Sequence, residues 1–197
     1  VPSYNIERDL RELTNIDSFE DCSSWTLQAI DGLIADKRIE TVVISYRIAY
    51  SLYGYYEDTY PRLTDERGDR NRRAIWNSLL ASIETLENAG KRTLFVVQAP
   101  ELPRSIGYLI PREKMLNSNG ATLDWWNRRI EFVYENMVEL HRVTEVIDLA
   151  NSFCDEKTCL SVQDGKALYF DNDHMSVDGA RRAANVIIPI ILKKDVR

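Results

Sequence analysis

The sequence predicts an α/β fold, a three-layer α/β/α sandwich whose central sheet is mostly parallel. Short runs of β-branched and other apolar residues, typical of buried strands, occur at residues 41–46, 93–98 and 144–149. Segments of a dozen or more residues with apolar side chains at helical spacing lie between them. Strands that alternate with such helices form right-handed βαβ units, which build a parallel sheet covered on both faces.

The expected elements follow one another along the chain. The expected helices cover residues 23–35, 71–88, 123–141 and 177–192, and the expected strands cover residues 41–46, 93–98, 144–149 and 166–170. Ser176 is expected to be the N-cap of the last helix. Two long loops are expected, the tyrosine-rich residues 50–70 and the stretch after Pro100 that contains Asn119-Gly120.

Length and charge limit the possible functions. The 197 residues suffice for one α/β domain, and no repeat or linker divides them, so a single domain over residues 1–197 is expected. The net charge of −6 argues against a nucleic-acid partner, because neutralising phosphates requires clustered Lys and Arg. No apolar run approaches the roughly 20 residues that span a bilayer.

Two of the three cysteines, Cys154 and Cys159, lie close together in the sequence. Asp155–Thr158 between them can turn, so a short disulfide loop is one interpretation and three unrelated thiols is the other. A metal site is disfavoured, because the nearest His is distant and there is no second Cys pair. A disulfide would indicate an oxidising compartment. It would also leave Cys22 without a partner in this sequence, and a partner cysteine upstream is one explanation.

The strongest candidate for chemistry is the segment Asp171-Asn172-Asp173-His174, between the last extended segment and the last helix. A general-base histidine needs one ring nitrogen for the nucleophile and an acceptor that holds the other. A carboxylate three residues earlier on a turn can fold back to Nδ1, and Asp171 satisfies this spacing. Asp173 is expected to face away, toward the start of the final helix. The alternative is a helix-capping turn that happens to contain a histidine.

The carboxyl ends of the strands are where open parallel sheets bind ligands. Here these ends are polar or turn-forming: residues 45–47, residues 98–100, Asp148 and Asp171. Arg47 could stabilise an oxyanion or orient substrate, and an ion pair with Glu57 or Asp58 is an equally good interpretation. His141 ends a helix, where a partly cationic imidazole is favoured, so a structural cap is expected for it.

Residues 167–180, Ala-Leu-Tyr-Phe-Asp-Asn-Asp-His-Met-Ser-Val-Asp-Gly-Ala, resemble the last block of SGNH hydrolases. They are most similar to the SGNH domain fused to bacterial membrane acyltransferases of acyltransferase family 3, the polysaccharide O-acetyltransferases. Residues on the block's pattern are Tyr169, Asp171, His174, Ser176, Gly179 and Ala180. Met175 replaces the usual leucine, which conserves volume. The resemblance implies an SGNH hydrolase or flavodoxin-like sandwich with Asp171 and His174 catalytic.

Two further stretches resemble the same family. Residues 42–50 are similar to its arginine strand, with Arg47 on the arginine and Ile48 where tryptophan is common. Cys154 and Cys159 match a family disulfide. Together with residues 167–180, these stretches extend the resemblance over most of the chain from about residue 40 onward.

The family's nucleophile block, Gly-Asp-Ser-His after the first strand, is missing, since the sequence contains no Gly-Asp-Ser. Ser18, Ser23 and Ser24 precede the arginine strand without an apolar strand before them, and Ser23 or Ser24 is expected to cap the first helix. Two explanations stay open. The first strand or strands, with the nucleophile, lie upstream of Val1, as the absent start methionine and the unpaired Cys22 favour. Otherwise the domain is degenerate and only binds glycan or a protein partner.

The resemblance implies an extracytoplasmic or periplasmic enzyme domain that an upstream segment tethers to the inner membrane. The upstream serine would take an acyl group, chiefly acetyl, from a donor delivered by an associated membrane domain. It would pass this group to a carbohydrate acceptor, or to water as an esterase, with His174 as base and Asp171 orienting it. The sequence indicates no metal and no dissociable cofactor.

Overall fold

The computed structural model describes residues 16–54, 68–109 and 117–193, with side chains from residue 24 onward. The chain forms two compact units. The first consists of Val1–Gly54, Asp65–Val96 and Asn136–Val146. The second consists of Tyr55–Thr64, Val97–Glu135 and Ile147–Arg197, and it contains the Asp171–His174 segment.

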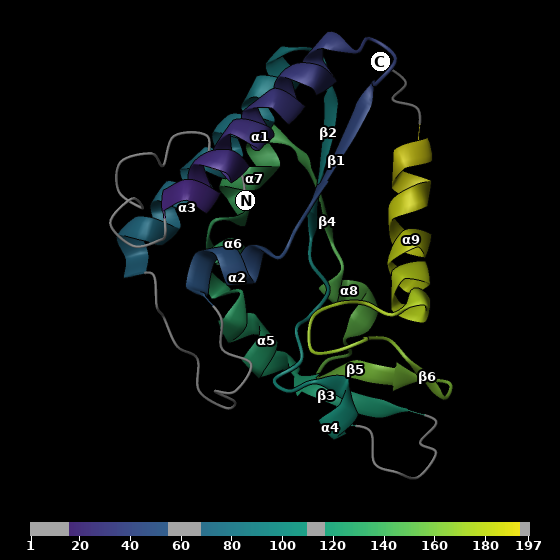
Figure 1. Cartoon of the computed structure of the whole chain (residues 1–197). Coiled ribbons are helices and arrows are strands. Elements are labelled where there is room, and N and C mark those ends of the chain that lie inside the picture. Colours follow the sequence, from purple (N-terminus) through teal and green to yellow (C-terminus); the bar gives the residue numbers. More distant parts are fainter. Residues whose placement is uncertain (1–15, 55–67, 110–116, 194–197) are drawn as a thin grey trace. The chain divides into compact units, whose positions relative to one another are not determined.

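Helices and strands alternate along most of the chain (Figure 1). The helices are α1 (Ile16–Ala35), α2 (Ile48–Tyr53), α3 (Gly68–Asn88), α4 (Ile106–Leu109), α5 (Leu123–Arg129), α6 (Glu131–Glu135), α7 (Met137–Val143), α8 (Ala150–Phe153) and α9 (Val177–Leu192). The strands are β1 (Thr41–Ser45), β2 (Arg92–Val97), β3 (Ser118–Thr122), β4 (Glu145–Asp148), β5 (Thr158–Gln163) and β6 (Lys166–Ala167).

The three apolar runs that predicted strands form one sheet in the order β1-β2-β4. β1 and β2 pair in parallel, from Thr41 opposite Arg92 to Ser45 opposite Val96. Five of the six β2 residues are buried, as expected for a central strand of a parallel sheet. The α/β class with a parallel sheet is therefore confirmed.

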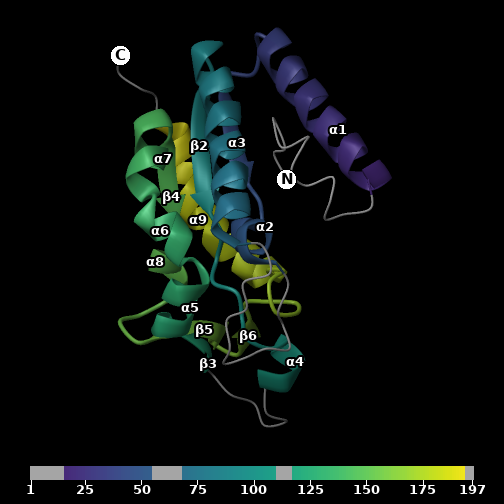
Figure 2. The ribbon, with the colours of Figure 1, turned by 90° about the vertical axis from the view of Figure 1, so that its left-hand side faces the viewer.

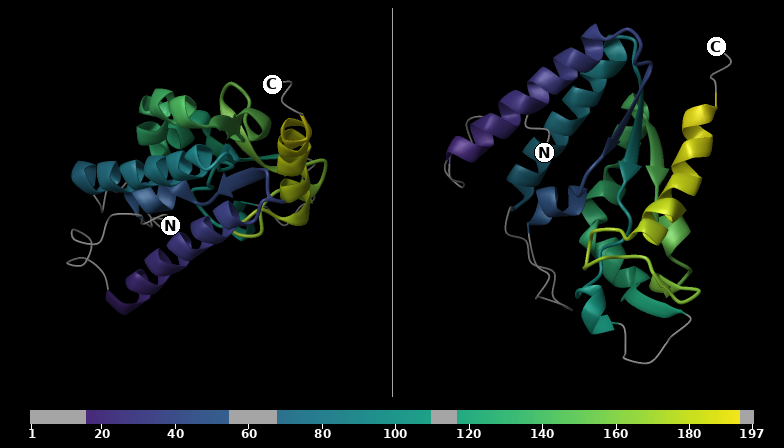
Figure 3. Two further views of the ribbon diagram at one scale, coloured as in Figure 1. Left: turned by 90° about the horizontal axis from the view of Figure 1, so that it is seen from above. Right: turned by 45° about the vertical axis from the view of Figure 1, so that its right-hand side comes forward.

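Helix α1 confirms the helix expected at residues 23–35 and begins earlier, at Ile16. Its C-terminal half places Ile30 in a buried cluster with Val42 of β1 and Leu86 of α3. Toward its other end α1 diverges from α3 (Figures 2 and 3), and Trp25 there is 71% exposed. The helix is thus held through one half of its length.

The early start of α1 overturns the expectation that Ser23 or Ser24 is an N-cap. Both residues, like Ser18, lie inside the helix, where the backbone N–H groups are not the orphans that a cap satisfies. The Ser24 hydroxyl instead accepts a hydrogen bond of 3.2 Å from the Gln28 amide.

One expected helix and one expected loop have different boundaries from those that the sequence predicted. The helix expected at residues 123–141 is three short helices, α5, α6 and α7, because the backbone leaves helical angles at Ile130 (φ −119°) and Asn136 (φ −105°). The loop expected at residues 50–70 is helical at both ends, where α2 ends and α3 begins. Ile48 and Leu52 of α2 are fully buried, which explains the helix. Residues 55–67 lie outside the described residues.

A second sheet, in the order β3-β5-β6, is antiparallel and was not expected. It includes Asn119-Gly120, for which the expectation of a loop is wrong. Gly120 is there because of close packing, since a Cβ at this position would lie 2.3 Å from Leu102 Cδ2 and 2.9 Å from Ser161 Cβ. The strand expected at residues 166–170 is limited to β6.

The expected disulfide between Cys154 and Cys159 is confirmed. It joins the residue after α8 to β5. The Asp155 carboxylate closes the turn between the two cysteines by accepting hydrogen bonds from the backbone N–H groups of Lys157 (2.8 Å) and Thr158 (2.7 Å).

Helix α9 has the boundaries that the sequence predicts, and its cap is confirmed. The Ser176 hydroxyl accepts a hydrogen bond from the Gly179 N–H (3.2 Å). The first turn of α9 also passes close to the preceding chain, since a Cβ on Gly179 would lie 2.0 Å from the Leu168 carbonyl oxygen. That oxygen already accepts a hydrogen bond from the Ser176 N–H (3.0 Å). Only glycine allows this approach.

We expect Gly179→Ala to lower the free energy of unfolding by at least about 2 kcal/mol, because its methyl group forces the helix start away from Leu168. Urea denaturation measures this loss. Gly107→Ala in α4 is the matched control, since a Cβ there meets nothing within 4 Å. Equal stability of the two variants would contradict the close packing at Gly179.

Candidate active site

The Asp171–His174 segment forms a closed turn between β6 and α9 (Figure 1). Tyr169 and Met175 form an antiparallel bridge at its base, and the Phe170 N–H donates to the His174 carbonyl (2.7 Å). The four-residue tip therefore has a fixed backbone conformation. Sequence reasoning located this turn correctly.

Asp171 binds both the backbone and the side chain of His174. Its Oδ1 accepts hydrogen bonds from the N–H groups of Asp173 (3.0 Å) and His174 (2.8 Å). Its Oδ2 lies 2.7 Å from His174 Nδ1. Because an ionised carboxylate only accepts, Nδ1 carries the proton, and Nε2 is the basic nitrogen of the neutral ring. The His174 side chain is 74% exposed.

The pKa of Asp171 shows that this carboxylate is ionised over the neutral range. Partial burial acts to raise the pKa, but hydrogen bonds from the backbone N–H groups of Asp173 and His174 and from the His174 ring outweigh it. The pKa is lowered to about 2.

Asp173 does not face away from His174, so that expectation is wrong. Its side chain is 6% exposed, and its Oδ1 lies 3.4 Å from His174 Nδ1. That distance puts the Asp173 carboxylate on the same side of the turn as the imidazole, to which its negative charge is attracted when the ring is cationic. Two carboxylates thus surround Nδ1.

Asp171, Asp173 and His174 also offer possible metal-ligand atoms that lie within 4.8 Å of one another. A cation bound at these atoms would have to displace the Nδ1 proton that holds the ring to Asp171. The three side chains therefore fit an acid–base role better than a metal site.

The loop that follows β2 holds the turn through three hydrogen bonds to it and to its base. The Leu102 N–H donates to the Asn172 carbonyl (2.6 Å), and the Ile106 N–H donates to the Asp171 carbonyl (2.9 Å). The buried hydroxyl of Tyr169 donates to the Pro100 carbonyl (2.7 Å). The backbone of the candidate site is therefore tied to the carboxyl end of β2.

A buried ion pair fixes this loop in turn. Glu101 Oε2 lies 2.6 Å from Arg129 Nε, and the two side chains are 3% and 0% exposed. Gln98 Nε2 donates to the other Glu101 oxygen (3.1 Å). Glu101 lies between Pro100 and Leu102, both of which bind the turn region, so the ion pair positions the contacts to Asp171 and Asn172.

A family model described as the SGNH domain fused to AT3 domains matches residues 2–189 of the chain. The chain belongs to this family. Membership confirms the resemblance and indicates a role of acyl-transfer or hydrolase type, in a family described as fused to acyltransferase-3 domains. The chain matches none of the curated proteins and none of the solved structures with which it was compared.

Two other residues singled out from the sequence, Arg47 and His141, belong to the first unit. Arg47 is in the first unit, directly before α2, with its guanidinium 5.2 Å from the centroid of the Tyr50 ring. Its proposed ion-pair partners, Glu57 and Asp58, lie outside the described residues. His141 is exposed in the last turn of α7, and its role as a structural cap stays a prediction. No helix in the described ranges is both long and apolar enough to cross a bilayer.

Sequence reasoning missed Glu101 and Arg129. They are 28 residues apart, and neither belongs to a recognisable motif. The Ala99-Pro100 pair indicates the end of a strand, and this strand end is the one signal in the sequence that the loop borders a site. The pair does not indicate which later segment of the chain the loop binds.

We expect the Asp171 carboxyl to titrate near 2 in a 13C NMR experiment. Because this pKa lies below the ordinary value of about 3.9, Asp171 stabilises the folded state above that pH. The contribution is lost as pH falls from about 4 toward about 2. The excess stability of the wild type over Asp171→Asn should shrink over the same interval. A titration midpoint near 4 would contradict the hydrogen bonds assigned to this carboxylate.

We expect Glu101→Gln to lower the free energy of unfolding by about 3–5 kcal/mol, because it removes the carboxylate that pairs with the buried Arg129 guanidinium. Asp124→Asn is the matched control. It removes an exposed carboxylate from the neighbouring Arg128 and should cost about 0.5 kcal/mol or less. Similar losses in urea denaturation of the two variants would show that Glu101 and Arg129 are not a buried pair in solution.

Proposed function

We propose that this SGNH domain acts in O-acyl transfer, chiefly acetyl, to cell-surface carbohydrate, or in hydrolysis of such esters. The observation that carries the proposal is the 2.7 Å contact between Asp171 Oδ2 and His174 Nδ1. It orients the ring and fixes its tautomer, as a general-base histidine requires. Family membership supports the reaction class.

In the proposed reaction, His174 Nε2 takes the proton of a serine hydroxyl as the serine oxygen attacks the acyl carbonyl. The resulting imidazolium, stabilised by Asp171, returns the proton to the leaving group of the donor. In the second half, Nε2 takes the proton of a sugar hydroxyl or of water, whose oxygen attacks the acyl-serine. Collapse of the second intermediate releases the ester or the acid, and His174 returns the proton to the serine.

The serine is proposed to come from a Gly-Asp-Ser block upstream of Val1. Ser18, Ser23 and Ser24 lie within α1, which is not the strand-to-helix turn that presents a nucleophile. Arg47 is proposed to orient substrate or to stabilise the oxyanion, since it follows β1 at a carboxyl end.

Both units are proposed to belong to one SGNH domain, because the family match covers residues of each. We further propose a periplasmic or other extracytoplasmic location, with an associated membrane domain delivering the acyl donor. The Cys154–Cys159 disulfide supports an oxidising compartment.

We expect His174→Ala to lower kcat for acetyl-ester turnover by at least about 100-fold in the protein that includes the upstream segment, because the general base is lost. His141→Ala is the matched control and should leave kcat unchanged, since this exposed residue in the last turn of α7 has no part in the proposed chemistry. Equal rates for wild type and His174→Ala would refute the role of His174. Absence of turnover with every ester and acceptor would instead favour a module that only binds glycan or a protein partner.

A further inference from the structure

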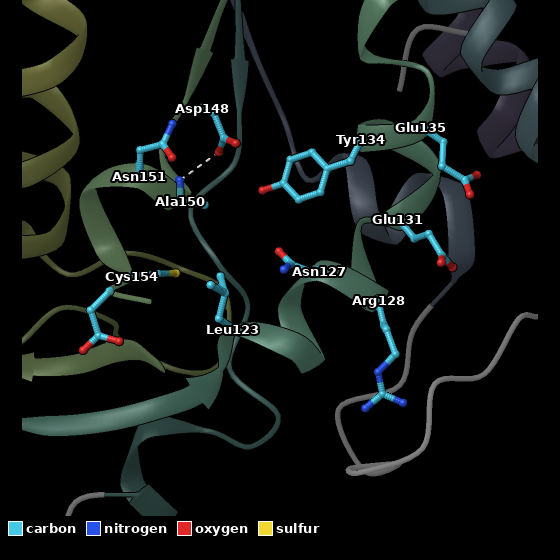
Figure 4. A pocket seen from close by; sticks show the side chains of 11 residues that line it. Leu123, Asn127, Arg128, Glu131, Tyr134, Glu135, Asp148, Ala150, Asn151 and Cys154 are labelled. Carbon is cyan, nitrogen blue, oxygen red and sulfur yellow. Dashed lines mark hydrogen bonds between the residues drawn. The ribbon is translucent and has the colours of Figure 1, made fainter. Parts of the chain in front are cut away.

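A polar cavity in the second unit has no role in the proposed chemistry. Its volume is about 630 Å³, within the range of about 300–1,000 Å³ that is typical of small-molecule sites. Helices α5 and α6 form one side, and the end of β4, α8 and the segment that follows α8 form the other (Figure 4). The turn at residues 171–174 does not line it.

Hydrogen-bonding side chains enter the cavity from both sides. Figure 4 shows Asn127 and Tyr134 on the α5–α6 side and Asp148 and Asn151 on the other. Within the described ranges, the exposed side-chain amides of Asn127 and Asn151 form no hydrogen bond to another residue. They are available to donate to and accept from a ligand.

Asp148 is the partly buried carboxyl group of this cavity. One of its oxygens accepts a hydrogen bond from the Ala150 N–H (2.9 Å). Burial raises the pKa of Asp148, although hydrogen bonds from the Ala150 N–H and from the Tyr134 side chain act in the opposite direction. A carboxyl group in such surroundings gains from a ligand that donates a hydrogen bond without adding negative charge.

The charges around the cavity disfavour an anionic ligand. Among the described residues, four carboxyl groups line it, from Asp148, Asp155, Glu131 and Glu135, against the guanidinium of Arg128. Arg128 already pairs with Asp124 on the same helix (3.2 Å). Among the described residues, no three of these carboxyl groups come as close together as Asp171, Asp173 and His174 do, so they do not form a three-carboxylate metal site.

We infer that this cavity binds a neutral, hydroxyl-rich ligand, a saccharide. Sugar hydroxyls donate hydrogen bonds to carboxyl oxygens and also pair with both the N–H and C=O groups of the Asn127 and Asn151 amides. The C–H faces of a sugar ring can pack on Tyr134 and Leu123, the aromatic and aliphatic side chains of the lining. Binding here does not depend on the chemistry proposed for His174.

The test is a 1H–15N NMR titration of the 197-residue chain with three neutral trisaccharides, maltotriose, mannotriose and galactotriose. We expect at least one to shift the backbone amide signals of residues 123–135 and 148–155. The double variant Asn127→Ala/Asn151→Ala should weaken this binding at least 10-fold. Asn185→Ala, which removes an exposed amide on α9 outside the cavity, should leave the Kd unchanged.

Three results would overturn the inference. One is the absence of shifts with all three trisaccharides, and another is equal binding by the double variant and the wild type. The third is tighter binding of the trigalacturonate anion or of the glucosamine trimer cation than of any neutral sugar. Because these readouts are binding alone, their failure is distinguishable from a failure of ester turnover in the His174 experiment.

Discussion

The two carboxylate oxygens of Asp171 accept different hydrogen bonds, and the geometry of the candidate site depends on both. Oδ1 accepts the backbone N–H groups of Asp173 and His174, which closes the turn, while Oδ2 holds the His174 ring. A side chain without two acceptor oxygens at this position could not make both sets of contacts. The hydrogen bonds that create the shape also keep the carboxylate ionised, so the structure of the turn and its electrostatics have one cause.

That turn is a surface feature, and its stability comes from contacts below it. The carbonyl groups of Asp171 and Asn172 accept hydrogen bonds from the loop after β2, and a buried Glu101–Arg129 pair fixes that loop. Buried ion pairs contribute little net stability compared with apolar packing, but they are costly to break, so they favour one arrangement over its alternatives. A site that must keep Nδ1 within hydrogen-bond distance of Asp171 benefits from such specificity. On the opposite side, Gly179 lets α9 start directly against Leu168 and so fixes where the turn ends.

Local signals in the sequence were sufficient for the parts of this fold that are locally determined. The period of 3.6 and the Ser176 cap gave α9 its boundaries, and the spacing of Asp171 and His174 identified their contact. The antiparallel sheet was not predicted because the pair Asn119-Gly120 is typical of a turn. The close packing of Gly120 against Leu102 and Ser161, which places this pair in a strand, cannot be seen in the sequence. Glu101 and Arg129 escaped for a related reason, since their pairing exists only once α5 packs beneath the loop. The breaks at Ile130 and Asn136 leave the apolar period intact, so periodicity alone shows one helix where there are three.

Asp148 and Asp171 show how one unit can give two carboxyl groups opposite properties. Backbone N–H donors lower the pKa of Asp171, and burial raises the pKa of Asp148. A firmly ionised carboxylate suits the orientation of a histidine that must become cationic, whereas a carboxyl group of higher pKa suits a neutral, hydrogen-bonding ligand. The cavity and the Asp171–His174 turn share no residue, so the side chains that line the cavity are not those that make the turn. The proposed recognition site and the proposed proton-transfer site therefore use different carboxyl groups within this unit, each with the pKa shift that its proposed role requires.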